Sequence, residues 1–196
     1  MGPSVLFLGL AVNEESIRAC AQKPKCGNFW AMSKLSPRLQ LIYDQLIPGK
    51  PVWDICCDHG YLGLKAYQAG AFPQVYFVDQ VDSIIEKLKT TFRKEFLQAD
   101  FHQQAYFFSS RAEELPREIT GTAVIAGVGA YTIFKILCTL ESKSFLQAQK
   151  LILVPQRDEQ KLQELLKERH CFGYKSWTLA GEVQERGRSR CVFVLE

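Results

Sequence analysis

The chain has 196 residues, a length typical of one domain, and 47% of them are hydrophobic and 23% charged. This composition excludes a disordered chain, which could not bury enough apolar surface to offset the entropy of ordering. The longest apolar run near the N-terminus, residues 5–12, is shorter than the roughly 18 apolar residues of a membrane span and follows no basic residue, so we expect no membrane partner. The net charge of +3 permits an anionic partner such as RNA but does not by itself indicate one.

Seven cysteines are spread along the sequence without a C-x-x-C pair, and the three histidines lie far apart. This distribution does not favour a metal site, because metal-binding cysteines and histidines come at close, characteristic spacings. Unpaired cysteines are typical of a reducing cytoplasm, where we expect the protein to act. Residues 1–31 show no sustained periodicity, so we predict a poorly ordered N-terminal extension before a single domain over residues 32–196. An N-terminal arm packed on that domain is the alternative.

From residue 35 onward, patterns typical of helices and strands alternate along the chain. In chain order they predict a helix from Ser36-Pro37 to Pro48-Gly49, a strand over 52–57, a helix over 62–69, a strand over 75–78, a helix over 82–96, strands over 106–108 and 123–126, a helix over 131–140, a strand over 151–154, a helix over 160–169, and strands over 174–180 and 190–195 that form a hairpin. Alternating strands and helices favour parallel βαβ units. We therefore predict an α/β fold with a mostly parallel twisted sheet, helices on both faces and an antiparallel C-terminal hairpin at one edge.

The loop after the first predicted strand reads DICCDHGYLG over residues 54–63. Loops at this place in doubly wound sheets bind ligands, and the N–H groups of the following helix favour an anion. The G-x-G-x-x-G spacing of a pyrophosphate site is absent, which favours a small carboxylate. Asp79 ends the second predicted strand, where a carboxylate can accept hydrogen bonds from ribose hydroxyls.

An acidic residue on the first strand, a short glycine loop and a second acidic residue are arranged as in the S-adenosylmethionine site of Rossmann-like methyltransferases. Asp54 or Asp58 would then face the ligand's ammonium group, and Asp79 would hold the ribose. In the structural alternative, Asp54 caps the loop and Asp79 caps the next helix. Gly127 and Gly129 follow the fourth strand, either to let a ligand approach the backbone closely or to form a tight turn.

Four short motifs are spaced along the chain: Leu35-Ser36-x-Arg38-Leu39, Asp54-Ile55-x-x-Asp58-His59-x-Tyr61-Leu62, Ile125-Ala126-Gly127-x-Gly129 and Leu151-Ile152-Leu153-x-Pro155. Together they resemble the bacterial tRNA adenine N1-methyltransferases that modify adenine 22, a family of class I S-adenosylmethionine-dependent enzymes. The chain differs from the family where it has Cys56 for a glycine, Arg111 for an acidic or amide residue and Ala130 for a second glycine. It also shows no heptads of the C-terminal coiled-coil domain that family members often carry.

The resemblance implies a Rossmann-like fold, S-adenosylmethionine as cofactor and tRNA as substrate. It places at the cofactor Asp54, Cys56, Asp58, His59, Gly60, Asp79, Gln80, Arg111, Ala112, Ala126, Gly127 and Gly129. The N1 lone pair of adenine is already a nucleophile, so such an enzyme mainly positions the reactants and stabilises the charge that develops on the base. We expect Asp58 to stabilise that charge and Tyr61 to stack on the base.

We expect contacts with RNA phosphates from five basic residues, which are Lys34, Arg38, Arg186, Arg188 and Arg190. Each could instead be ordinary solvated surface. Two other functions stay open at this point: a methyltransferase of another small-molecule or protein substrate, and a non-catalytic binding module that keeps the cofactor fold.

Overall fold

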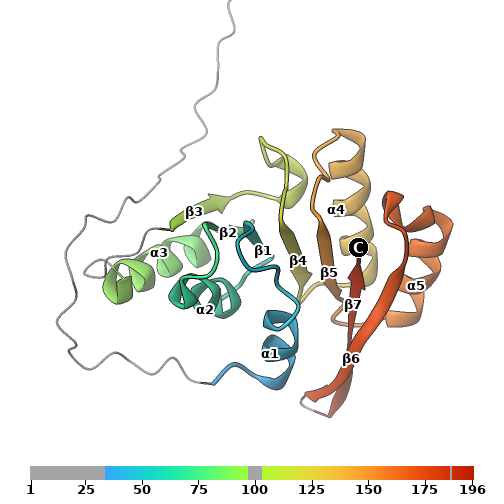
Figure 1. Ribbon diagram of the computed structural model, residues 1–196, viewed down its shortest axis with the longest axis horizontal. Helices are drawn as coiled ribbons and strands as arrows, with labels where there is room; N and C mark the ends of the chain where they lie inside the picture. Colours follow the sequence, from blue (N-terminus) through green and yellow to red (C-terminus); the bar gives the residue numbers. More distant parts are fainter. Residues whose placement is uncertain (1–33, 97–102, 186) are drawn as a thin grey trace, which may run out of the picture.

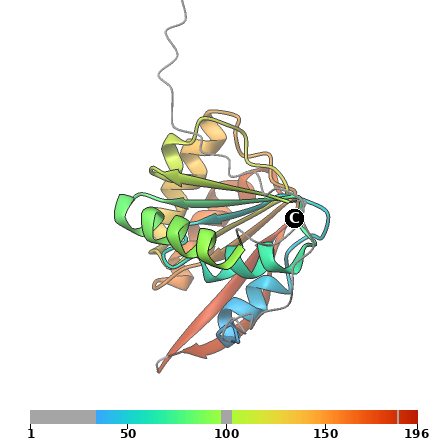
Figure 2. The ribbon, with the colours of Figure 1, turned by 90° about the vertical axis from the view of Figure 1, so that its left-hand side faces the viewer.

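The computed structural model describes residues 34–96, 103–185 and 187–196. Within them, one mostly parallel sheet lies between two layers of helices (Figures 1 and 2). Its strands are β1 (Val52–Ile55), β2 (Gln74–Asp79), β3 (Gln104–Ser109), β4 (Thr122–Ala126), β5 (Lys150–Val154), β6 (Trp177–Glu185) and β7 (Arg188–Leu195). They follow the order β3-β2-β1-β4-β5-β7-β6, with β7 antiparallel to both β5 and β6. The predicted fold class is confirmed, whereas the predicted extension over residues 1–31 lies outside the described residues.

The helices begin and end close to the positions that the sequence predicts. They are α1 (Pro37–Tyr43), α2 (Tyr61–Ala69), α3 (Asp82–Phe96), α4 (Ala130–Ser142) and α5 (Glu159–Glu168), with short 3₁₀ turns η1 (Ala112–Glu114) and η2 (His170–Gly173). The Ser36 hydroxyl accepts a hydrogen bond from the Leu39 N–H and caps α1. This helix ends before the predicted Pro48, because Gln45 and Leu46 donate to carbonyls three residues back and tighten the chain into turns.

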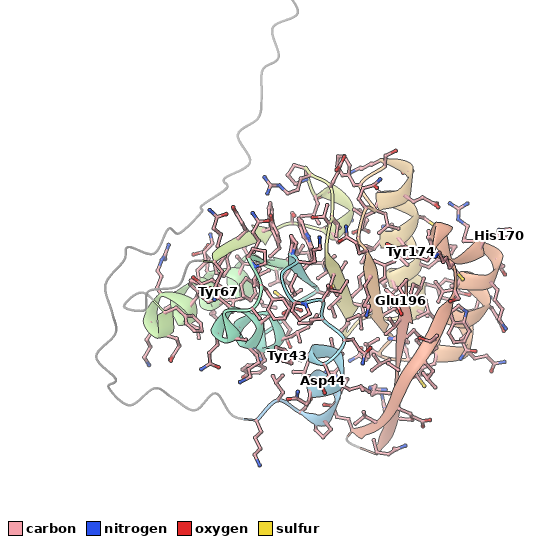
Figure 3. The ribbon with its side chains drawn as sticks, viewed as in Figure 1. Tyr43, Asp44, Tyr67, His170, Tyr174 and Glu196 are labelled. Atoms are coloured by element: carbon pink, nitrogen blue, oxygen red, sulfur yellow. The ribbon has the colours of Figure 1, made fainter. Side chains whose placement is uncertain are left out.

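The core is divided between the two faces of the sheet. Helices α1, α2 and α3 lie on one face and α4 and α5 on the other (Figure 2). Helix α3 buries Ile85, Leu88, Phe92 and Phe96, which recur every three or four residues as predicted. The ring centroid of Tyr67 in α2, labelled in Figure 3, lies 4.6 Å from that of Phe92 in α3. These contacts hold α2 and α3 against β1 and β2 and so fix the loops that lead into both helices.

The C-terminal hairpin extends past the sheet and lies beside α1 (Figures 1 and 2). The turn of the hairpin is shorter than the predicted turn over residues 181–187, because β6 continues to Glu185, which pairs with Arg188. The pairing register shifts between Leu179 and Gly181. A Cβ atom at Gly181 would lie only 2.9 Å from the Leu41 side chain of α1, so this glycine lets the helix and the hairpin approach closely.

The five cysteines of the described ranges carry free thiols: Cys56, Cys57, Cys138, Cys171 and Cys191. In the same ranges, no helix combines the length and the apolar character that crossing a membrane requires.

Candidate active site at the carboxyl edge of the sheet

A pocket of about 940 Å³ opens at the carboxyl ends of the parallel strands. The strand order reverses between β1 and β4 at this place, which is where doubly wound sheets bind their ligands. The loops that follow β1, β2, β3, β4 and β5 all contribute to its walls, and so do the start of α1 and the tip of the hairpin. Most of the residues predicted to bind a cofactor therefore line one cavity.

Asp54 forms the buried floor of this pocket. It is only 5% exposed, and its Oδ2 accepts a hydrogen bond of 3.0 Å from the Gly63 N–H of α2. Gly63 allows this contact because any Cβ there would lie 2.3 Å from the Phe77 ring. Burial raises the pKa of Asp54 to about 7; the Gly63 N–H opposes that rise, and the charge of Asp79 adds to it. A cation placed beside Asp54 would relieve the cost of ionising it.

Asp79 joins the first two loops at the pocket. Its Oδ2 accepts a hydrogen bond from the Asp58 N–H, and its Oδ1 accepts one from the Val81 N–H, both at 3.1 Å. The structural role of capping the segment before α3 is therefore present. A carboxylate has about four acceptor positions, so these two bonds leave capacity for the hydroxyls of a ligand. Asp79 can serve both purposes at once.

The loop after β1 contains three residues in the left-handed backbone conformation. Cys56 has φ 61°, Asp58 φ 50° and Gly60 φ 65°. Strand β1 ends at Ile55 instead of the predicted Cys57 because Cys56 turns the chain away from extended geometry. This conformation costs about 1–2 kcal/mol for a residue with a Cβ. Burial, together with nearby carboxylates, raises the pKa of Cys56 to about 12, so its thiol stays protonated and forms a neutral part of the wall.

Three exposed side chains between β1 and the start of α2 line the pocket. The side chains of Asp58 and His59 are 68% and 70% exposed, and Asp58 Oδ1 lies 3.9 Å from His59 Nδ1. Tyr61, the first residue of α2, is 50% exposed, and its ring centroid lies 5.5 Å from that of His59. In contrast to Asp54, these groups are accessible to a second molecule.

The loop after β4 forms the opposite wall. Gly127 has φ 78°, and a Cβ added to it would meet no atom within 4 Å, so its backbone borders open space. Gly129 has φ −73° and does not line the pocket. Gly60, in the loop after β1, does not line it either, because the Leu88 side chain packs against it. Ala126 and Gln80 do line it. Of the two glycines after β4, only Gly127 needs the conformational freedom of glycine.

The loop after β3 adds residues that the sequence did not single out. The Ser110 hydroxyl is buried, and the described residues offer it no hydrogen-bond partner. Glu113 forms an ion pair of 3.3 Å with Lys135 of α4, across the pocket wall. Arg111 and Ala112 line the pocket as predicted, and Arg111 is exposed. The sequence has no motif for Ser110 and Glu113, because their place at the pocket depends on how the chain packs after β3.

The predicted RNA-binding residues divide into two groups. Lys34, Arg38 and Arg190 line the pocket, whereas Arg188 is exposed outside it and Arg186 lies outside the described residues. Arg38 Nε lies 3.1 Å from Glu185 Oε2, which joins α1 to β6. No local pattern predicts this ion pair, because its partners are separated in the sequence by almost the whole domain.

The donors and acceptors of the pocket fit a nucleoside that carries an amino acid group. Two carboxylates at neighbouring strand ends, Asp54 and Asp79, suit an ammonium group and a ribose diol. The left-handed loop and the start of α2 suit a carboxylate. The unpartnered hydroxyl of Ser110 is available to a nucleobase. Within the described parts of the chain, no three His, Cys, Asp or Glu side chains gather in a way that could hold a metal ion.

Comparisons with known proteins agree with this geometry. A family model described as a methyltransferase domain matches residues 35–179. A search of curated proteins finds no significant match. Among solved structures, the chain is similar to Sp1610 of Streptococcus pneumoniae, with a TM-score of 0.68, 20% identity, and coverage of 83% of this chain and 70% of that one. Sp1610 has also been crystallised with S-adenosyl-L-methionine.

Two further solved structures are methyltransferases named TrmK. The B. subtilis m1A22 tRNA methyltransferase gives a TM-score of 0.63 at 25% identity, covering 83% of this chain and 66% of that one. TrmK of M. capricolum, in complex with S-adenosyl-homocysteine, gives 0.65 at 17% identity, with coverage of 82% and 68%. The chain thus spans about two thirds of the length of these relatives, and the predicted class I methyltransferase fold is confirmed.

Proposed function

The chain belongs to the family of methyltransferase domains, and we propose that it transfers the methyl group of S-adenosylmethionine to N1 of an adenine in tRNA. One observation carries the proposal: a single pocket combines the buried carboxylate of Asp54 in β1 with the accessible side chains of Asp58, in the loop that follows, and Tyr61, at the start of α2. The similarity to the TrmK structures, which the chain matches over most of its own length, supports adenine N1 and tRNA as the target.

The carboxyl ends of β1, β2 and β3 would form the cofactor side of the pocket. Asp79 would hold the ribose, Asp54 the ammonium group, and the loop around Cys56 the carboxylate. Ser110 and Arg111 would border the adenine ring. S-adenosylmethionine supplies an electrophilic methyl group on its sulfonium, and the chain's own task is to hold the two reactants in line.

The substrate side begins at Asp58. Adenine N1 needs no strong base, because its lone pair is free in the neutral ring. The base becomes cationic on methylation, and the carboxylate of Asp58 would stabilise that positive charge as it develops. Tyr61 would stack on the ring, while the open backbone at Gly127 leaves room for the base. An adenine within folded tRNA must first leave its stack to reach such a pocket.

The tRNA backbone would follow the basic side of the pocket mouth. Lys34 and Arg190 line it and could contact phosphates directly. Arg38 is already paired with Glu185, so we assign it to shaping the wall between α1 and the hairpin. A cytoplasmic location agrees with an enzyme of this kind and with the free thiols.

Two measurements test the proposal. Titration calorimetry should show S-adenosylmethionine binding, and a transcript of tRNA should gain a methyl group that nucleoside mass spectrometry identifies as N1-methyladenosine. A transcript with guanine in place of adenine 22 is the matched control. Cofactor binding without methylation of any tRNA would favour a different substrate. Absence of cofactor binding would favour the non-catalytic binding module.

A further inference from the structure

Exposed large apolar side chains gather around the mouth of the pocket. In the described residues, the exposed large hydrophobic side chains are Tyr61, Val81, Tyr131 and Leu179. Tyr61 begins α2, Val81 directly precedes α3, and Tyr131 is the second residue of α4. All three therefore lie where a parallel strand is connected to the next helix, at the edge of the sheet where the pocket opens. Only Leu179, in β6, lies elsewhere.

Tyr131 is the most exposed of the four, at 62%. It lies two residues after Gly129, and its neighbour Thr132 lines the pocket. Lys161 of α5 places its ammonium group 6.0 Å from the centre of the Tyr131 ring. The ring thus stands at the lip of the pocket, outside the cavity itself.

The basic side chains near Tyr131 form ion pairs that are exposed to solvent. Lys161 pairs with Glu164 at 3.1 Å, Lys135 with Glu113 at 3.3 Å, and Arg157 lies 4.0 Å from Asp158. The side chains of Lys135 and Arg157 are 67% and 79% exposed. Exposed pairs of this kind contribute little to stability, so their cations can exchange a carboxylate for a phosphate. An aromatic ring among such cations is complementary to a nucleotide.

We propose that Tyr131 is a stacking platform for the RNA base next to the adenine that enters the pocket. The proposal rests on the proposed function, since it requires an RNA substrate. Extruding a base from RNA leaves its neighbour without a stacking partner. A ring at the lip of the pocket replaces that partner, and Lys161 and Arg157 neutralise the adjoining phosphates. The platform would lower the free energy of the extruded complex without touching the cofactor.

The test compares Tyr131→Ala, Tyr131→Phe and Leu179→Ala. The last is a matched control, because it removes a comparably exposed large side chain away from the lip. Dissociation constants for fluorescein-labelled tRNA are measured by anisotropy with S-adenosylhomocysteine present, together with cofactor affinity by calorimetry. We expect Tyr131→Ala to weaken tRNA binding about tenfold, as the loss of one base–aromatic stack does. Tyr131→Phe and Leu179→Ala should bind tRNA as the unmodified protein does, with cofactor affinity unchanged throughout.

Each other outcome has a distinct meaning. If the unmodified protein binds and methylates tRNA but Tyr131→Ala binds it equally well, the platform is refuted and the proposed function stands. If the unmodified protein binds no RNA, both are refuted. If Tyr131→Ala instead turns an oligomer into a monomer in analytical ultracentrifugation and leaves RNA affinity unchanged, this surface is a contact between copies of the chain.

Discussion

Ionisation of Asp54 should make cofactor binding depend on pH. Burial raises the pKa of this carboxyl from its ordinary 3.8 to about 7, so the free folded protein holds a proton there at acidic pH. A cofactor ammonium group requires the ionised form, and binding below pH 7 must then release the proton. With a pKa of about 7, about half of these groups are ionised at pH 7 and about 1% at pH 5, so affinity should fall about 50-fold between pH 7 and pH 5. Asp54→Asn keeps an acceptor for the Gly63 N–H but removes the titration.

The same group should affect folding with the opposite dependence. The pKa of Asp54 is higher in the folded state than in the unfolded state, so the folded state is favoured while the group is protonated. This contribution is complete below about pH 3.8 and is lost as pH rises to about 7. At 1.36 kcal/mol per pKa unit, the shift from 3.8 to about 7 corresponds to about 4 kcal/mol in the free energy of unfolding. Without cofactor, the free energy of unfolding should therefore decline with pH more steeply in the unmodified protein than in Asp54→Asn.

Calorimetry between pH 5 and pH 7 tests the first dependence. S-adenosylhomocysteine is titrated in two buffers of different ionisation enthalpy, which yields the number of protons released. His59→Gln is the control, because it changes another polar side chain of the same pocket and leaves Asp54 in place. An affinity that stays flat with pH, or a slope that persists in Asp54→Asn, would refute the argument. Asp54 would then serve only to hold Gly63.

Three further tests examine the rest of the pocket. Asp79→Ala removes the acceptor for ribose, and cofactor affinity should fall by about 1–3 kcal/mol in calorimetry; unchanged affinity with an intact fold would remove Asp79 from the site. Asp58→Asn should slow a single turnover on the order of 10²-fold while sparing cofactor affinity, since its interaction strengthens only as charge develops on the base. An equal loss of affinity would instead assign Asp58 to the cofactor. Arg38→Glu and Glu185→Arg should each reduce tRNA methylation by a few fold, about 1 kcal/mol, and the double exchange should restore it. Failure of the exchange to restore activity would mean that Arg38 binds phosphate directly.

The regular elements of this fold could be predicted because local pattern and tertiary packing agree. Helix α3 spans the predicted residues, since Ile85, Leu88, Phe92 and Phe96 form one apolar face that the sheet covers. The errors lie where tertiary contacts decide. Strand β6 continues past Gly181 because that glycine accommodates Leu41 of α1, a contact that no local pattern reveals.

The residues of the candidate site also separate into those that local pattern predicts and those that tertiary packing decides. Asp54, Asp58 and Asp79 could be predicted because the carboxyl ends of parallel strands must meet at one edge of the sheet. Ser110, Glu113 and Glu185 could not, because their presence at the pocket depends on how η1 and the hairpin pack. Such residues are recognised by their neighbours in space, and the sequence gives no motif for them.

Cys56 shows that the loop after β1 keeps its shape without a glycine at its first turn. The backbone there is left-handed, which disfavours a residue with a Cβ by about 1–2 kcal/mol. Two hydrogen bonds hold the next residue in place: the Cys57 N–H donates to the Val78 carbonyl at 3.1 Å, and the Gly60 N–H donates to the Cys57 carbonyl at 2.7 Å. The Asp58 N–H is held by Asp79 as well. Because strand β2 fixes the loop from outside, the wall of the pocket is formed with Cys56 at this turn, and this supports the proposed enzyme over a binding module that has lost its site.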